Sequence, residues 1–280
     1  MSLAMMFLVL LGAALHATWN VIIKAGSDRL LDTVLIACGA ASIALLALPF
    51  VPLPERASWP CLGTSMIIHL GYFSLIALAY RTGDLSYAYP IMRGAAPPLT
   101  AIVAALTVRE PLSSGAWSGV ALISAGILML TADSWRSRRL RPATAASSLL
   151  NAFVIVAYTL VDGIGVRLAG NAWSYILWLF VLIPFPLLTL VLFTRPRAFL
   201  GQLHARWKPG LVGGVCTTVS YGLALWAMTL APIALIAALR ETSVIFGTVF
   251  AALFLRERFG FVRYLAAGAV TLGAVAIKLF

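Results

Sequence analysis

Long apolar stretches separated by short polar breaks run along the whole chain. Each stretch is close to the roughly 20 helical residues that cross a bilayer core of about 30 Å. Glycine, proline and charged residues mark the ends of the stretches. The pattern predicts transmembrane helices over ten ranges: 3–23, 31–50, 61–80, 86–107, 114–132, 143–166, 173–193, 210–230, 232–254 and 261–279. We therefore expect an all-α polytopic membrane protein of ten spans, with no room for a soluble domain.

An internal repeat divides this pattern into two halves. A shift of 147 residues places Arg93 on Arg240 and Glu110 on Glu257, which is notable where charged residues are rare. Because each half has an odd number of spans, homologous halves must cross the membrane in opposite senses. The sequence thus predicts two inverted five-helix repeats and a basic connecting loop, over residues 1–134, 143–280 and 135–142 respectively.

Composition and charge agree with a membrane protein. The chain is 62% hydrophobic and 10% charged, which is more apolar surface than one soluble core buries. Its net charge of +11 does not indicate nucleic-acid binding, because the basic residues form short clusters between apolar runs. Alternate loops carry fourteen Lys and Arg on one face and four on the other. The positive-inside rule then predicts a multi-pass protein of the inner (plasma) membrane with basic loops in the cytoplasm and both termini outside.

Sequence motifs for ATP hydrolysis and for common enzyme chemistry are missing. The chain has no GxxxxGK[ST] phosphate-binding loop, no HExxH and no GxSxG. Its histidines share no helical register for a metal, and its cysteines have no CxxC spacing: His16, His69, His204, Cys38, Cys61 and Cys216. We expect no enzymatic activity, no cofactor and no metal, although an intramembrane enzyme stays an unsupported alternative.

Four charged residues lie well inside predicted spans, away from their ends. Arg93 is midway along the fourth span, Arg240 and Glu241 are midway along the ninth, and Asp162 is well inside the sixth. An ionised side chain at a helix centre costs roughly 2.5–3.5 kcal/mol on insertion scales, so such residues face a partner or a cavity. Two interpretations stay open: Arg93 pairs with Asp162 or Glu241 to hold helices together, or these residues line a substrate cavity. Asp162 is also a candidate site for a coupling proton.

Two adjacent prolines follow the arginine of the fourth span. Pro97 and Pro98 cannot donate the helical hydrogen bonds to residues four earlier, which frees the carbonyls of Arg93 and Gly94. We expect a kink there, with carbonyls for a substrate ammonium beside a guanidinium for a carboxylate. A purely mechanical kink is an equally good interpretation.

Polar and aromatic side chains recur at helical spacing in several spans, and they predict either interhelical hydrogen bonds or a wet, aromatic-lined cavity. The spacing is clearest in the first, third and eighth spans. The candidate substrate-binding set is His16, Trp19, Asn20, His69, Tyr72, Tyr80, Tyr89, Arg93, Tyr158, Asp162, Thr217, Tyr221, Arg240 and Glu241.

Small residues on the fifth and tenth spans indicate close helix packing. Gly115 and Gly119 form a GxxxG pattern, and Gly268 and Ala274 line the tenth span. Such faces serve packing within a monomer or a homodimer interface. We expect a monomer, with the homodimer as the alternative.

Three sequence stretches resemble the EamA family of the drug/metabolite transporter superfamily. They are His16-Ala-Thr-Trp-Asn-Val-Ile-Ile-Lys24 in the first span, and Leu106-Thr-Val-Arg-Glu110 and Phe254-Leu-Arg-Glu257 at the ends of the fourth and ninth. The resemblance covers the whole chain and implies ten spans in two inverted repeats. It also implies export or exchange of metabolites, commonly amino acids, through a central cavity lined by both halves.

Residues and resemblance together predict a secondary transporter that exports amino acids or similar small metabolites by alternating access. Its expected partners are a small-molecule substrate and the lipid bilayer, without nucleic acid. One alternative is a drug or lipophilic-cation exporter of the same fold. The other is a membrane subunit that does not transport.

Overall fold

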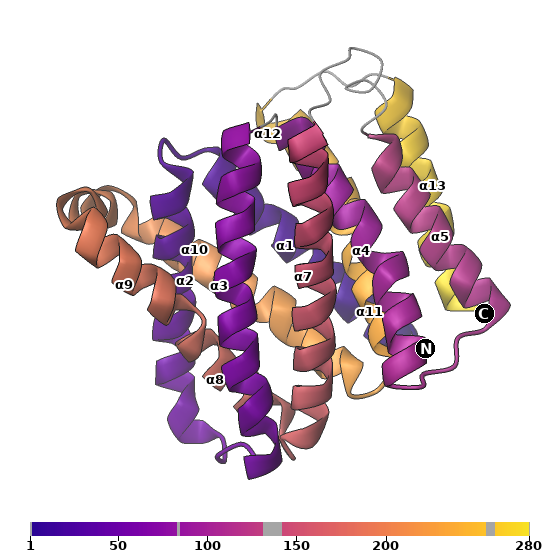
Figure 1. Ribbon diagram of the computed structural model, residues 1–280, viewed down its shortest axis with the longest axis horizontal. Coiled ribbons are helices and arrows are strands. Elements are labelled where there is room, and N and C mark those ends of the chain that lie inside the picture. Colours follow the sequence, from indigo (N-terminus) through magenta and orange to yellow (C-terminus); the bar gives the residue numbers. More distant parts are fainter. Residues whose placement is uncertain (1, 83–84, 131–141, 256–260, 280) are drawn as a thin grey trace.

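The computed structural model describes residues 2–82, 85–130, 142–255 and 261–279, and the side chains within them except at 73–74, 76–82, 85–89, 248 and 251–255. Every element in these ranges is a helix (Figure 1). The predicted all-α class is therefore confirmed. The predicted connecting loop lies outside the described residues up to 141, and Pro142 already begins a helix.

The first half contains five long helices. The starts of α1, α2 and α5 are capped by the side chains of Ser2, Asp28 and Ser113, which accept hydrogen bonds from free backbone N–H groups. The helices are α1 (Leu3–Lys24), α2 (Arg29–Ala47), α3 (Trp59–Thr82), α4 (Leu85–Thr107) and α5 (Ser114–Met129).

The second half has more breaks than the apolar pattern predicts. The seventh predicted span is two helices that meet at Pro184, and the ninth is interrupted at Glu241 and Thr242. The eighth is the later part of a longer helix that bends at Arg206. The helices are α7 (Pro142–Leu168), α8 (Ala172–Leu182), α9 (Pro184–Thr194), α10 (Pro196–Met228), α11 (Ile233–Arg240), α12 (Ser243–Leu255) and α13 (Phe261–Leu279).

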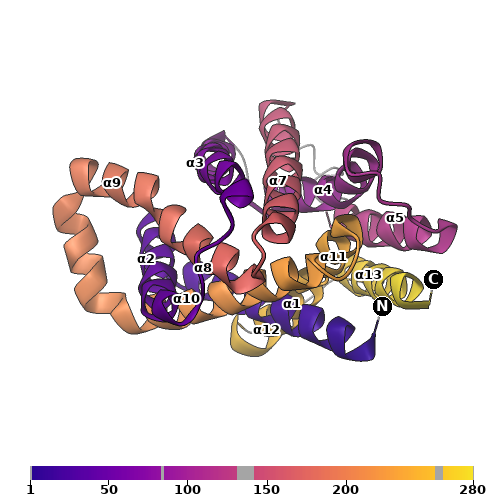
Figure 2. The ribbon, with the colours of Figure 1, turned by 90° about the horizontal axis from the view of Figure 1, so that it is seen from below.

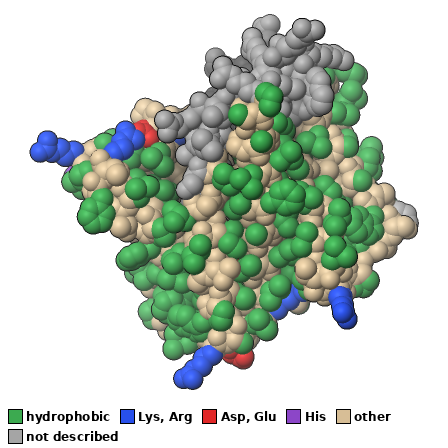
Figure 3. Space-filling view, in the orientation of Figure 1, with side chains coloured by type: hydrophobic (Ala, Val, Ile, Leu, Met, Phe, Trp, Pro, Cys, Tyr) green, Lys and Arg blue, Asp and Glu red, His purple; other side chains and the backbone are tan. Residues whose placement is uncertain are grey.

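Helix length and hydropathy support a membrane protein without fixing the number of spans. Among the described residues, six segments are long and apolar enough to cross a bilayer: Leu3–Lys24, Arg29–Phe50, Pro142–Leu168, Ala172–Thr194, Pro196–Met228 and Phe261–Leu279. Figure 3 shows a flank covered by hydrophobic side chains, with charged side chains near its ends. Such a flank suits lipid contact. The count of ten stays a prediction.

The two halves of the chain interleave. α3 packs against α7, which pairs the third predicted span with the sixth. α1 packs against α10, which pairs the first with the eighth, as the repeat requires. α4 also packs against α7, and α1 against α12. Figure 2 shows α1, α4, α7, α10 and α11 around the middle of the bundle. The charged residues predicted inside spans are carried by these helices or by the break after α11.

The predicted glycine packing is intramolecular at Gly119. A Cβ atom there would lie 2.7 Å from the Ile277 side chain and 2.8 Å from the Gly273 carbonyl oxygen. α5 and α13 therefore approach closely enough to exclude a side chain at this point. Gly268 has open space around it, and the homodimer alternative is left untested.

Loops that the charge count assigns to one face do meet at one end of the bundle. Arg195 and Arg206, before and within α10, form ion pairs of 2.9 Å and 2.8 Å with Asp28 and Asp32 of the α1–α2 region. At the other predicted face, Arg167 at the end of α7 forms an ion pair of 2.6 Å with Glu110. Which end faces the cytoplasm stays a prediction.

Candidate functional site

A buried ion pair joins the two halves at the centre of the bundle. Arg93 Nε of α4 lies 2.8 Å from Glu241 Oε2, and the two side chains are 4% and 5% exposed. Arg93 Nη2 also lies 3.4 Å from His16 Nε2 of α1. Of the two partners that the sequence left open for Arg93, the structure selects Glu241. Pairing does not decide whether these residues also bind substrate.

Asp162 is held by hydroxyl groups instead of an arginine. Tyr221 of α10 donates a 2.6 Å hydrogen bond to Asp162 Oδ2, and Tyr175 of α8 donates one of 3.0 Å to Oδ1. The Arg240 guanidinium lies 4.6 Å from the centre of the Tyr221 ring, which is a cation–π contact. Tyr221 thus contacts both the buried acid and the second arginine.

Aromatic rings extend this group toward α3. The rings of His69 and Tyr158 are 4.5 Å apart, Tyr72 lies 5.6 Å from Tyr158, and Tyr158 lies 6.3 Å from Tyr221. The side chain of His69 is fixed by Ser65, whose carbonyl oxygen lies 2.9 Å from its Nδ1. The candidates found by spacing in the third and eighth predicted spans therefore belong to one aromatic cluster, which Tyr158 of the sixth span joins together.

The candidates of the first span are connected to Arg93 through His16. The rings of His16 and Trp19 make an edge contact at 5.0 Å, and the Asn20 side chain donates a 2.7 Å hydrogen bond to the His16 carbonyl. Among the described residues, Trp19 Nε1 is buried without a hydrogen-bond partner. Thr217 is half-buried one turn before Tyr221. The remaining candidates, Tyr80 and Tyr89, have side chains outside the described part of the structure.

The helical hydrogen-bond ladder is broken in the ninth predicted span, where the sequence predicted no kink, while the kink predicted in the fourth span stays a prediction. α4 is one helix from Leu85 to Thr107, with Pro97 and Pro98 inside it. In the ninth predicted span, Glu241 and Thr242 donate their backbone hydrogen bonds to residues three earlier, so the α-helical ladder is broken. Hydrogen bonds to residues three earlier define a 3₁₀ turn. No proline marks this turn in the sequence. Glu241, the partner of Arg93, lies at this break.

Tyr175 is the site residue that sequence reasoning missed. It is completely buried on α8, and its contact with Asp162 joins residues 13 positions apart. The only available signal was a tyrosine hydroxyl in a strongly apolar predicted span, where a buried O–H usually has a partner.

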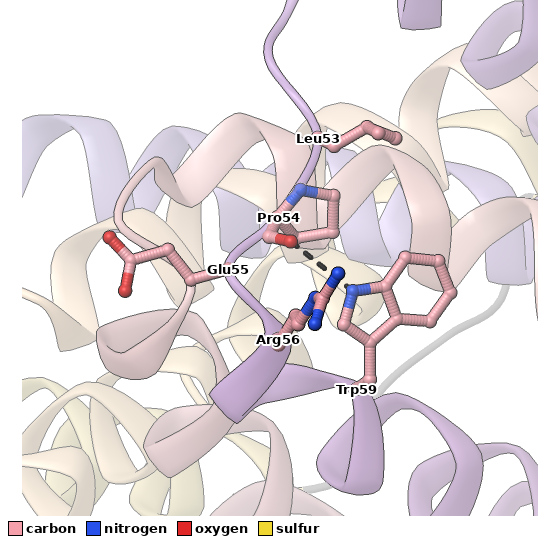
Figure 4. A pocket seen from close by; sticks show the side chains of 5 residues that line it. All are labelled: Leu53, Pro54, Glu55, Arg56 and Trp59. Carbon is pink, nitrogen blue, oxygen red and sulfur yellow. Dashed lines mark hydrogen bonds between the residues drawn. The ribbon is translucent and has the colours of Figure 1, made fainter.

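The central site is closed in this structure. Arg93, Arg240 and Glu241 are all buried. In the described part, no three His, Cys, Asp or Glu side chains are grouped so that they could hold a metal ion. A pocket of about 520 Å³ lies instead at the α2–α3 connection, lined by Leu53, Pro54, Glu55, Arg56 and Trp59 (Figure 4).

Comparison with known proteins identifies both the family and the fold. The model of the EamA-like transporter family matches residues 3–132 and 144–279. A solved structure titled "Crystal structure of protein" is similar with a TM-score of 0.78 and 13% identity, over 100% of this chain and 98% of that one. At this identity the likeness concerns the fold alone. Curated protein sequences give no match.

Proposed function

Because the chain belongs to the EamA-like transporter family, we propose that it moves small zwitterionic metabolites, such as amino acids, across the membrane by alternating access. The observation that carries this proposal is the buried pair of Arg93 and Glu241, contributed by the two halves of the chain. We assign export as the direction, following the resemblance of the sequence.

A zwitterion matches the central pair in charge. In the closed site, Arg93 and Glu241 neutralise each other at 2.8 Å. A substrate carboxylate at Arg93 and its ammonium at Glu241 replace that pair without leaving an unpaired buried charge. A simple cation or anion satisfies only one partner, and a buried charge left alone costs about 3–5 kcal/mol. This difference corresponds to a preference for zwitterions of roughly a hundredfold or more.

The aromatic cluster supports the alternative substrate class. The rings of His69, Tyr72, Tyr158 and Tyr221 form a cluster of the kind that binds lipophilic cations through cation–π contacts. Arg240 already occupies the Tyr221 face, which opposes a second cation there. We therefore favour zwitterions over drugs or lipophilic cations. A subunit without transport activity is the remaining alternative.

Uptake by purified protein in proteoliposomes distinguishes a zwitterion transporter from a lipophilic-cation transporter and from a subunit without transport activity. Labelled neutral amino acids and cationic dyes should be measured with wild type, Arg93→Ala and a matched control, Thr100→Ala, on a buried residue of the same helix whose hydroxyl bonds to the Ala96 carbonyl. We expect wild type to transport amino acids, Arg93→Ala to lose at least tenfold of that activity, and the control to retain it. Dye transport that survives Arg93→Ala, without amino-acid uptake by wild type, would establish the alternative. No uptake of either class would indicate a non-transporting subunit.

A further inference from the structure

One face of α7 is polar although it is completely buried. Thr144, Ser148 and Asn151 follow one another at intervals of four and three residues, so they lie on one helix face. Their exposed fractions are 1%, 0% and 0%. The same helix carries Tyr158 and Asp162 further along. Polar side chains thus lead from the Pro142 end of α7 toward the aromatic cluster.

Two atoms on this face have no hydrogen-bond partner among the described residues. Asn151 donates its amide only to the Met92 sulfur, at 3.2 Å, and its carbonyl oxygen is unpaired. Thr144 Oγ1 is also unpaired, and the Ser148 hydroxyl bonds only to the Thr144 carbonyl of its own helix, at 2.7 Å. Thioether sulfur is a weak acceptor. Burial of unpaired amide and hydroxyl groups is unfavourable, so a packing role alone would favour alanine or leucine here.

The opposite face of the same turns has the composition expected for lipid contact. Leu149, Leu150 and Phe153 are 45%, 53% and 54% exposed. The helices α3 and α4 pack against α7, and the Met92 contact shows that the polar face is turned toward α4. In Figure 1, α7 stands between α3 and α4 along most of its length. Its polar atoms are therefore enclosed by protein and separated from lipid.

We propose that Thr144, Ser148 and Asn151 line the route of the substrate between the central site and the Pro142 end of the bundle, and that the Asn151–Met92 contact closes this route in the structure described here. The inference rests on the proposed transport function. When α4 and α7 separate, the unpaired atoms gain water and the polar ends of a zwitterion as partners. The Met92 side chain is flexible and fills an irregular gap well, which suits a contact that repeatedly forms and breaks.

Cysteine labelling in lipid nanodiscs tests the route, because both ends of the protein are then open to water. In a background with Cys38, Cys61 and Cys216 replaced by alanine, single Ser148→Cys and Asn151→Cys variants react with a negatively charged methanethiosulfonate. Leu149→Cys and Phe153→Cys are the matched controls on the lipid face. We expect the two buried positions to react at least tenfold faster than the two exposed ones, and faster still when Met92→Ala is added. Equal or slower reaction at the buried positions, with and without Met92→Ala, overturns the proposal.

A second variant separates a route from a packing role. Asn151→Leu removes the unpaired amide, so we expect an unchanged or higher melting temperature together with a fall in transport of at least tenfold. Wild-type transport, or a lowered melting temperature, contradicts the proposal. Labelling needs no substrate, so it remains readable if the zwitterion assignment fails. Conversely, amino-acid uptake by wild type without labelling at Ser148→Cys refutes the route alone.

Discussion

The pairing of Arg93 with Glu241 makes a quantitative prediction about stability. Replacing Glu241 with glutamine leaves a guanidinium buried beside His16, without its carboxylate. Replacing Arg93 with methionine leaves the carboxylate buried instead. The double variant removes both charges and puts a hydrophobic group of similar length in place of the arginine. Each single variant should therefore be much less stable than the double variant.

The magnitude follows from burial and distance. Two unit charges about 4 Å apart attract by about 4 kcal/mol at an effective dielectric constant of about 20. Measured losses on breaking buried pairs are similar, about 3–5 kcal/mol. The Arg93 and Glu241 side chains are 4% and 5% exposed, so solvent screening removes little of this attraction. We expect each single variant to lose about 3–5 kcal/mol, and the double variant to lie within about 2 kcal/mol of wild type.

The assay is thermal unfolding of the three purified variants and wild type in the same detergent. A loss of this size lowers the melting temperature by roughly 10 °C for a chain of this length. All three variants should lose amino-acid transport, because each lacks one or both substrate partners. If Glu241→Gln costs less than about 1 kcal/mol, or if the double variant is as unstable as the single ones, the ion pair does not stabilise the closed site as we argue.

Further predictions concern the ends of the bundle, the buried acid and helix packing. Glu110→Gln should lower the free energy of unfolding by about 1 kcal/mol, because Glu110 caps α11 through a 2.8 Å bond as well as forming an ion pair; a melting temperature equal to that of wild type contradicts this. Asp162→Asn should abolish accumulation driven by a pH gradient while leaving substrate exchange, and an unchanged pH dependence of uptake would show a structural role. A cysteine at Arg197 should resist an impermeant thiol reagent added outside intact cells, whereas one at Arg56 should react; the reverse pattern would invert the predicted topology. Gly119→Val should lower the melting temperature by several degrees, since its side chain would overlap α13, and an unchanged value would refute the close contact.

Much of the fold could be predicted from the sequence, because helix formation depends on residues close together in the chain. Apolar length predicts helices directly, and the described elements agree in class and closely in most boundaries. The spacing of His69, Tyr72 and Tyr221 predicted either interhelical hydrogen bonds or an aromatic-lined cavity. In the structure their rings belong to one cluster around Tyr158. In-span charges also marked the central residues, since an ionised group in an apolar helix requires a partner or a cavity. Their role in substrate binding stays a prediction.

The tertiary structure alone decided which partner each charged residue takes. The sequence left two carboxylates, Asp162 and Glu241, as possible partners of Arg93. Only the packing of the two halves places Glu241 beside it. Asp162 instead receives two tyrosine hydroxyls, one of them from Tyr175, whose local sequence is simply apolar. The helix break at Glu241 likewise could not be predicted from a proline, because none lies there. Composition and periodicity indicate which positions of a helix require a polar partner. Which residue becomes that partner depends on contacts between segments distant in the chain, and these contacts form only when the helices pack.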